Sequence, residues 1–337
     1  MNIALSAHGN AMIHQVNRSA RLQVRVAAKT TEAQDIAGFE LVDWSGEDLP
    51  AFTAGSHVDV FMANGLVRQY SLRNNPSERH RYRLGVLRDQ KGAGGSIFMH
   101  DMLKSGDVIE ISHPRNAFPL NEQASSSLLL AGGIGVTPIL SMAHRLSTLG
   151  QDFALHYCAR NLDRMAFRSE LETGPFKTQV HFHRDDGPPE QKLNIAELLQ
   201  SSPKGTHLYV CGPRGFMDAV IGEAERSWPK ETIHREYFGK IADVGSSDDR
   251  SFAVQIASTG QVFAVPAGES VVSVLGTNGI EIPVSCEQGI CGTCVTRVLA
   301  GLPDHRDLYL TDAEHAANDQ MTPCCSRALS EIVVLDL

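Results

Sequence analysis

The sequence predicts three folded units in series: an antiparallel β-barrel, an α/β unit on a parallel sheet, and a small α+β unit. Residues 19–121 hold short alternating apolar runs separated by glycine, proline and asparagine, a pattern typical of a small antiparallel barrel. Residues 122–238 alternate apolar strands with helical stretches, which indicates a parallel sheet covered by helices. After a polar stretch over 239–250, interpreted as a linker, strands return over 251–337.

The expected strands of the barrel are RLQVRVAAK, HVDVFM, YRLGVL and DVIEIS. Residues 1–18 lack a basic start followed by an apolar block, so they do not resemble a signal peptide and are interpreted as an extension. No apolar run approaches the roughly 18 residues that a membrane-spanning helix requires. The sequence therefore predicts no association with a membrane.

The second and third units are predicted from runs with different periods. The expected strands of the second unit are SSSLLLAGG, FALHYCAR, TQVHFHR and HLYVCG, and its expected helices are PILSMAHRLSTLG, FRSELE, IAELLQ and GFMDAVIGEAE. In the third unit, FAVQIAS and QVFAVPAG predict a hairpin, VVSVLGTNG a short helix, and EIVVLDL a closing strand.

The negative charge of the chain is concentrated near its C-terminus. The net charge is −9, and residues 251–337 contain ten acidic and three basic side chains, a difference of −7. This balance argues against a nucleic-acid partner and favours docking to a positively charged protein. Plain solubilising charge remains the alternative.

Three of the seven cysteines, Cys286, Cys291 and Cys294, form the pattern C-x4-C-x2-C. This is the plant-type [2Fe–2S] spacing, which a distant fourth cysteine completes. Gly289 and Gly292 would let the short loop curl around a cluster and leave N–H groups free to bond its sulfurs. A structural zinc site is the weaker alternative, because such sites usually contain paired C-x2-C units. Without an export signal, clustered cysteines also indicate a reducing cytoplasm.

Two adjacent cysteines, Cys324 and Cys325, are candidates for the fourth ligand. Neighbouring residues on an extended backbone point to opposite faces. On that basis, at most one of the two would reach a given site.

Two segments of the barrel have the residue types of a phosphate site. The run LVRQYSLRN places Arg68 and Tyr70 on one strand face, with Gln69 and Ser71 on the other. Further along, Gly92, Gly94, Gly95 and Ser96 precede a helical pattern. A glycine-rich turn at a helix N-terminus offers N–H groups and a favourable dipole to a phosphate. Each segment alone is also compatible with an ordinary strand or turn.

The second unit contains a comparable glycine-rich segment. Gly132, Gly133 and Gly135 follow its first strand, and glycines there permit close approach of a pyrophosphate. Thr137 is predicted as the N-cap of the next helix, with Pro138 in its first turn. A second motif, Cys211-Gly212-Pro213, ends the strand HLYV.

Taken together, these motifs resemble the phthalate dioxygenase reductase family, which includes the vanillate demethylase reductases. The resemblance rests on CEQGICGTC followed by C-x-SRA, on R-x-Y-S, and on GGxGxTP with CGP, in the order of that family. It implies a flavin barrel and an NAD domain of the ferredoxin–NADP reductase superfamily, followed by a plant-type ferredoxin of β-grasp fold. In plant-type ferredoxins 29 residues separate the third and fourth ligands, and 29 lie between Cys294 and Cys324. The resemblance thus implies Cys324 as the ligand and Cys325 as a small buried residue.

The resemblance also implies roles for the flavin and nicotinamide residues. Arg68 would bind the flavin phosphate, Tyr70 would pack along the ribityl chain and ring, and Ser71 would hydrogen-bond near the reactive ring nitrogen. Cys211 would position the nicotinamide for hydride transfer, and Phe238 would lie over the flavin. The remaining expected cofactor contacts are Leu72, Val86, Gly94, Gly95, Ser96, Gly132, Gly133, Gly135, Thr137, Pro138, Arg160, Gly212 and Pro213.

The activity implied by the resemblance is electron transfer from NADH to FMN and then, one electron at a time, through the [2Fe–2S] cluster to a separate Rieske oxygenase. Domain order favours FMN over FAD. Arg160, Asp163, Arg164 and Arg168 offer partners for both NADH and NADPH, and the family favours NADH. Alternative interpretations are a reductase for another acceptor, such as a diiron monooxygenase, a general NADH oxidoreductase, or a non-enzymatic redox sensor.

Overall fold

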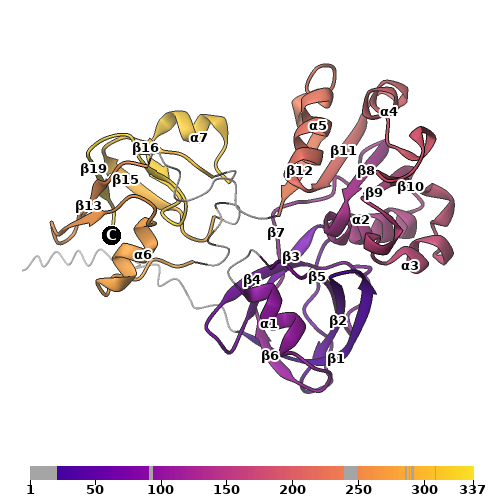
Figure 1. Ribbon diagram of the computed structural model, residues 1–337, viewed down its shortest axis with the longest axis horizontal. Coiled ribbons are helices and arrows are strands. Elements are labelled where there is room, and N and C mark those ends of the chain that lie inside the picture. The colour runs from indigo at the N-terminus through magenta and orange to yellow at the C-terminus, as the bar shows by residue number, and fades with distance from the viewer. Residues whose placement is uncertain are drawn as a thin grey trace, which may run out of the picture.

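A computed structural model describes the chain over residues 21–90, 94–238, 249–284, 287, 289, 292–307 and 309–337. Three separate sheets organise these residues, and each has its own apolar core. The barrel and the α/β domain pack against each other, and the C-terminal domain lies to one side of them (Figure 1).

The first sheet is antiparallel, with the strand order β4-β3-β6-β1-β2-β5 and with β7 paired to β3. Just after β4, the N–H of Arg73 donates to the carbonyl of Arg83 in β5 over 2.9 Å, so the two end strands meet and the sheet closes. The predicted barrel is therefore confirmed. Its elements are β1 (Leu22–Ala33), β2 (Ile36–Asp43), β3 (Ser56–Phe61), β4 (Val67–Ser71), β5 (Tyr82–Leu87), α1 (Gly95–Asp101), β6 (Val108–Ile111) and β7 (Arg115–Asn116).

The second sheet is parallel, with the order β10-β9-β8-β11-β12. Its strands are β8 (Ser126–Gly132), β9 (Phe153–Ala159), β10 (Val180–Arg184), β11 (Thr206–Gly212) and β12 (Ile233–Tyr237). Its α-helices are α2 (Val136–Leu149), α3 (Arg168–Thr173), α4 (Ile195–Ser201) and α5 (Arg214–Ala224). Short 3-10 turns are η1 (Gly133–Gly135), η2 (Leu162–Arg164), η3 (Lys177–Gln179), η4 (Pro189–Gln191) and η5 (Lys230–Thr232).

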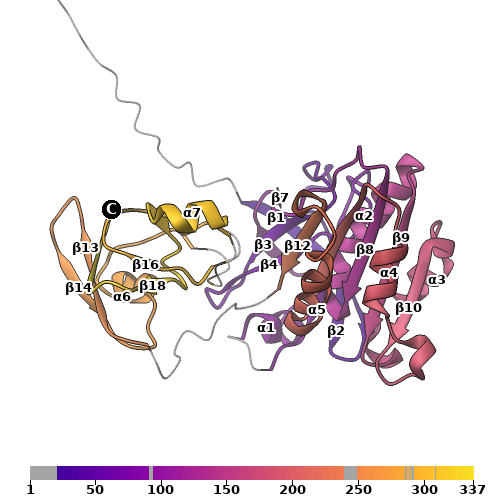
Figure 2. The same cartoon turned by 90° about the horizontal axis from the view of Figure 1, so that it is seen from above.

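Helices cover both faces of this parallel sheet (Figure 2). Alternate residues of β8 divide between the faces: Leu129 packs in the core that includes α2, and Leu128 in the core that includes α5. The four predicted strands and four predicted helices are confirmed. The edge strand β12 was not predicted, because its residues IHREY are mainly polar.

The third sheet has the order β14-β13-β19-β15-β17, with β13 and β19 parallel, and α6 packs against it. The predicted hairpin, helix and closing strand are confirmed as β13 with β14, α6 and β19. The elements are β13 (Phe252–Ile256), β14 (Val262–Val265), α6 (Val271–Thr277), β15 (Thr296–Ala300), β16 (Pro303–Asp304), α7 (Asp312–Ala317), β17 (Gln320–Met321), β18 (Arg327–Ala328) and β19 (Ile332–Leu335). Strands β16 and β18 form a separate antiparallel pair.

Candidate functional site

One large cavity, with a volume of about 2120 Å³, lies where the three domains meet. Drug-sized ligand pockets usually measure roughly 300–1,000 Å³, so this cavity has room for two nucleotides. Residues from every domain line it: the barrel contributes Arg68 and Ser71, the α/β domain Gly132 and Pro213, and the C-terminal domain Cys324. The structure thus brings together the three predicted groups of site residues.

The barrel side of the cavity is formed by the end of β4 and the start of α1. Arg68, Tyr70, Ser71, Gly95 and Ser96 all line it. The Arg68 guanidinium donates to the Val67 carbonyl over 2.6 Å, which holds the side chain near the backbone of its own strand. The arrangement could hold the phosphate of a flavin nucleotide, because it presents a cation beside the first turn of a helix.

The surroundings of Gly95 indicate whether this corner fits a flavin phosphate. A Cβ placed on Gly95 would lie 2.6 Å from Cγ of Arg68, so only glycine lets the helix start approach the arginine this closely. The N-cap of α1 is Gly94, whose φ of 88° lies in the left-handed region that favours glycine. Gly94 itself does not line the cavity, and Gly92 lies outside the described residues.

Two predicted flavin contacts have their side chains elsewhere. Leu72 and Val86 are fully buried in the barrel core and do not line the cavity. Their side chains stabilise the barrel beneath the site.

Glu236, near the end of β12, faces the barrel side of the cavity. The hydroxyl of Ser71 donates to its carboxylate over 3.5 Å, so this contact joins the barrel to the α/β domain. Burial raises the pKa of Glu236 to about 8, although the hydrogen bond from Ser71 acts to lower it. Glu236 is therefore mainly protonated at neutral pH and can donate a hydrogen bond into the cavity.

The α/β side of the cavity is a floor of backbone atoms at the carboxyl ends of β8 and β11. Gly132, Gly133 and Thr137 line it, as do Gly212 and Pro213. A Cβ on Gly212 would lie 2.9 Å from Cα of Gly132, so side chains do not fit between these strand ends. This edge is where parallel sheets bind nucleotides, and the glycine floor fits the close approach of a pyrophosphate.

Gly135 lets the start of α2 pack closely against the end of β11. A Cβ there would lie 2.3 Å from the carbonyl oxygen of Cys211. Gly135, and not Thr137, is the N-cap of α2, so the predicted cap was wrong. Thr137 already lies inside the helix, where its hydroxyl donates to the carbonyl of Ile134 over 3.0 Å. Pro138 is in the first turn as predicted, although it does not line the cavity.

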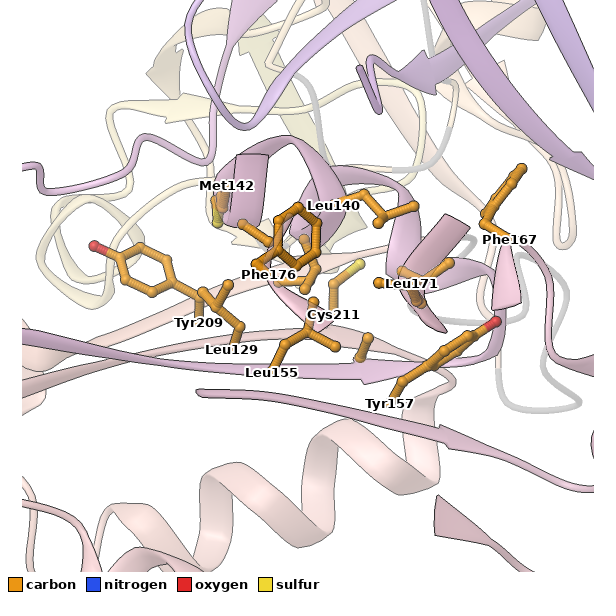
Figure 3. Close-up of a cluster of buried hydrophobic side chains, with 14 of the residues drawn as sticks. Leu129, Leu140, Met142, Leu155, Tyr157, Phe167, Leu171, Phe176, Tyr209 and Cys211 are labelled. Carbon is orange, nitrogen blue, oxygen red and sulfur yellow. The ribbon is translucent and has the colours of Figure 1, made fainter. Parts of the chain in front are cut away.

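Cys211 is fully buried, and its side chain lies in the core between the sheet and α2 (Figure 3). It does not line the cavity, unlike Gly212 and Pro213 beside it. Burial raises the pKa of Cys211 well above its ordinary value, and the nearby Glu236 adds to this effect. The side chain is therefore a neutral thiol, which argues against a nucleophilic role.

Arg160, Arg164 and Asp185 line the far end of the cavity, after β9 and β10. The Asp186 N–H donates to the Arg160 carbonyl over 3.1 Å, which brings the two strand ends together. This end could receive the adenosine half of a dinucleotide, with Asp185 as a partner for a ribose hydroxyl. Phe238 is partly exposed and also lines the cavity.

The predicted metal ligands Cys286 and Cys291 lie outside the described residues. Cys294 and Cys324 are described and buried, and the Cys324 thiol lies within hydrogen-bonding reach of the Cys294 and Cys325 thiols. Gly289 and Gly292 both have φ near +70°, as expected of a loop that curls around a cluster. Two thiols brought together beside such a loop fit iron–sulfur ligation.

Cys324 and Cys325 lie on a turn rather than on an extended segment, so the expected alternation was wrong for this pair. The turn forms because the Thr322 carbonyl accepts from the N–H groups of Cys325 and Ser326 over 3.1 and 2.9 Å. Cys325 is buried as predicted, with its sulfur 3.3 Å from the hydroxyl oxygen of Thr322. Cys324 differs from it in lining the cavity.

Several cavity residues were not predicted as site residues, among them Glu236, His57 and Asp185. Asp185 follows a predicted strand of the parallel sheet, so its position at the strand end was an available signal. Glu236 would have carried the same signal if β12 had been recognised. Nothing in the local pattern around His57 indicates a site.

Within the described ranges, no helix combines the length and the apolar character that crossing a bilayer requires.

Known protein families match two parts of the chain. Residues 129–221 match the oxidoreductase NAD-binding domain, and residues 254–329 match the 2Fe-2S iron-sulfur cluster binding domain. The second match spans all four predicted cysteine ligands.

Two curated relatives align over nearly the whole chain. A vanillate O-demethylase oxidoreductase of a Pseudomonas species is 55% identical over 94% of this chain and 100% of the relative. The phthalate dioxygenase reductase of Burkholderia cepacia is 40% identical over 94% of this chain and 97% of the relative. A solved phthalate dioxygenase reductase, described as a modular structure for electron transfer from pyridine nucleotides to [2Fe-2S], superposes with a TM-score of 0.77 at 40% identity, covering 94% of this chain and 98% of the other.

The fold and the site define an oxidoreductase with an NAD-binding domain and a [2Fe–2S] cluster binding domain. The chain belongs to the phthalate dioxygenase reductase family, which includes the vanillate O-demethylase oxidoreductases.

Proposed function

We propose that this protein supplies electrons from NADH to a separate Rieske-type terminal oxygenase, and that the partner is of the vanillate O-demethylase kind. The observation that carries the proposal is the single cavity shared by the R-x-Y-S segment, the glycine floor and Cys324. The identity of 55% to a vanillate O-demethylase oxidoreductase favours that kind of partner.

The cofactors divide the chemistry between them. A bound flavin supplies two-electron acceptance from a nicotinamide and release in single electrons, which an iron–sulfur centre requires. The protein supplies binding, orientation and protection from water. We assign those tasks to the residues around the cavity.

On the barrel side, Arg68 and the first turn of α1 would hold the flavin phosphate, and Tyr70 would pack along the nucleotide. The Arg68 guanidinium is the residue best suited to a phosphate, because it pairs a charge with several N–H donors. Ser71 and Glu236 would face the reactive edge of the flavin ring, since their contact spans the barrel and the α/β domain. The protonated Glu236 would hold a proton at its carboxyl oxygen beside that edge.

On the α/β side, the backbone at Gly132 and Gly212 would let the dinucleotide approach the strand ends. Pro213 is the N-cap of α5, so the start of that helix faces the cavity and favours an anionic group. Cys211 would position the ring indirectly, by fixing the strand end from within the core. Phe238 would cover the flavin until the nicotinamide displaces it.

The C-terminal domain would complete the path of electrons from the flavin to the oxygenase. Cys286, Cys291, Cys294 and Cys324 are the proposed iron ligands, and Cys324 lines the same cavity as the flavin-side residues. The acidic surplus of residues 251–337 supports docking to a basic patch on the oxygenase. The clustered spacing of the cysteines supports a reducing compartment, and we infer that this is the cytoplasm.

Reconstitution tests the partner. The holoprotein, NADH and the purified oxygenase component of a vanillate O-demethylase should give NADH-dependent demethylation of vanillate, and the oxygenase of a phthalate dioxygenase system should be served more slowly. Reduction of cytochrome c without turnover of either oxygenase would contradict a Rieske-type acceptor. Failure of NADH to bleach the flavin would contradict the reductase itself.

A further inference from the structure

Three metal-ligating side chains meet in the C-terminal domain and have no part in the redox route. His305 and Asp307 lie in the segment after β16, and His315 lies on α7. One nitrogen of each histidine and one oxygen of Asp307 all lie within 4.8 Å of one another. The two imidazole rings are stacked, with centroids 4.4 Å apart and planes inclined by 27°.

Asn318 selects the tautomer of a neutral His305. The Asn318 side-chain amide donates through Nδ2 to the Ala316 carbonyl over 3.1 Å, so its Oδ1 must face His305. That oxygen lies 3.2 Å from Nε2 of His305, which therefore carries the hydrogen and donates it. A neutral His305 then presents a lone pair at Nδ1.

This Nδ1 is a buried lone pair without a donor. Among the described residues, none lies within hydrogen-bonding distance of it. Oδ1 of Asp307 lies 3.9 Å from it. Two acceptors that face each other in a buried site are unfavourable unless a proton or a metal cation lies between them.

Asp307 is held in place for such a cation. Its side chain is fully buried, and its Oδ2 accepts from the backbone N–H groups of Tyr309 and Leu310 over 3.1 and 2.8 Å. Its Oδ1 lies 3.3 Å from Nε2 of His315 and accepts a hydrogen bond from the Ser326 hydroxyl over 3.4 Å. The carboxylate is thus fixed by backbone N–H groups through Oδ2, while Oδ1 has only side-chain partners among the described residues.

The spacing fits a small divalent ion. Ligand atoms bound about 2.0–2.1 Å from a tetrahedral zinc lie roughly 3.3–3.4 Å from each other. The separations of Asp307 Oδ1 from His315 Nε2 and from His305 Nδ1 are 3.3 and 3.9 Å, so small side-chain shifts are sufficient. Imidazole and carboxylate ligands suit Zn²⁺, whereas the predicted iron ligands are thiolates.

We propose that His305 Nδ1, Asp307 Oδ1 and His315 Nε2 bind a divalent transition-metal ion, Zn²⁺ being the best match, with water at a fourth position. Binding requires His315 to give up the hydrogen on Nε2 and carry it on Nδ1 instead. His305 already has the required tautomer.

The metal would stabilise the segment that packs on the cysteine loop. A Cβ on Gly292 would lie 2.1 Å from the ring of Tyr309, so this ring rests directly on the loop between Cys291 and Cys294. A Cβ on Gly289 would lie 3.0 Å from Cα of Asp307. An ion that ties residues 305 and 307 to α7 therefore fixes the cover of the iron–sulfur cluster from outside.

Calorimetric titration of the holoprotein with ZnCl₂ tests the site, after exposure to EDTA has removed adventitious metal. The wild-type chain should bind one zinc ion. Both His305→Gln and His315→Gln should weaken this binding by more than roughly 100-fold, beyond the 10–100-fold typical of losing an outer partner. The control His113→Gln alters an exposed histidine of the barrel and should bind zinc as the wild type does.

Two further measurements keep the test decisive. The visible absorption of the iron–sulfur cluster should be unchanged in all three variants, which shows that the domain is folded. Anomalous scattering at the zinc edge in crystals of the holoprotein should place zinc between His305 and His315, apart from the iron. The proposal would be overturned if the wild-type chain bound no zinc, or if His305→Gln and His315→Gln bound zinc as tightly as the wild type does.

Discussion

Ser71 and Glu236 are 165 residues apart in the chain, and the hydroxyl of one donates to the carboxylate of the other over 3.5 Å. One residue ends a barrel strand and the other lies in the edge strand of the α/β domain. Both line the cavity. Because burial raises the pKa of Glu236 to about 8, this contact places a proton donor where the two proposed nucleotide sites meet.

The rate of NADH oxidation should depend on the charge of Glu236. Above pH 8 the carboxylate ionises, and a negative charge beside the reactive ring opposes the arrival of hydride. The rate of ferricyanide reduction should therefore fall as the pH rises through about 8. In Glu236→Gln this inflection should disappear.

Ser71→Ala is the matched control for that profile. The hydrogen bond from Ser71 lowers the pKa of Glu236, so its loss should move the inflection to higher pH. An inflection that stays at the same pH in Glu236→Gln would assign the titration to another group.

Local patterns predicted most of the fold, and contacts between distant segments account for what was missed. Alternation and helical period depend on near neighbours, so they identified strands such as β8 and helices such as α2. The polar edge strand β12 has no such period, and Glu236 was therefore not recognised as a site residue. The contact of His305 with His315 arises only when α7 folds back on the segment after β16.

The adjacent residues Cys324 and Cys325 also show the limit of reasoning from local patterns. Counting residues from Cys294 selected Cys324, and Cys324 lines the cavity. The reasoning from an extended backbone failed, because the Thr322 carbonyl closes a turn at this point. The assignment of Cys324 as the fourth ligand stays a prediction, which rests on spacing along the chain and not on backbone geometry.

Cys324→Ser should lose the iron–sulfur cluster, whereas Cys325→Ala should keep it. Cys325 fills space beside Thr322, so its replacement should lower the free energy of unfolding by only about 1–2 kcal/mol. Iron content and visible absorption of the purified variants measure the outcome. A cluster that survives in Cys324→Ser and is lost in Cys325→Ala would reverse the assignment.

Gly95→Ala should weaken FMN binding without preventing folding. The new Cβ would lie 2.6 Å from Cγ of Arg68, so the arginine has to move away from the helix start. Loss of a charge-assisted hydrogen bond, worth about 1.5–3 kcal/mol, corresponds to roughly 10–100-fold weaker binding. Recovery of flavin fluorescence on dilution measures the release.

The control for this change is Gly222→Ala in α5. Nothing lies within 4 Å of a Cβ at that position, so the substitution should stabilise the helix by up to about 1 kcal/mol and leave FMN binding unchanged. If FMN binds equally well to Gly95→Ala, Arg68 does not hold the phosphate.

An ion pair between Arg73 and Glu170 should stabilise the packing of the barrel on the α/β domain. The two groups lie 2.8 Å apart, with only 6% of the Arg73 side chain exposed, and the guanidinium also stacks 4.0 Å from the ring centroid of Phe167. Glu170→Gln leaves the buried guanidinium without its counter-charge, which should cost about 3–5 kcal/mol. Glu172→Gln breaks an exposed pair on the same helix and should cost less than about 0.5 kcal/mol.

The pH dependence of stability provides a second readout of Glu170. Burial alone would raise the pKa of Glu170, but the hydrogen bond from His144 and the charge of Arg73 outweigh it and lower the pKa to about 2. A carboxyl group whose pKa is depressed in the folded state stabilises that state at pH values above its ordinary pKa of 4.5. This contribution is lost as the pH falls toward 2. Urea unfolding followed by flavin fluorescence should therefore show a smaller loss of stability on acidification in Glu170→Gln than in the wild type. Equal losses in the two proteins would mean that other carboxylates control acid unfolding.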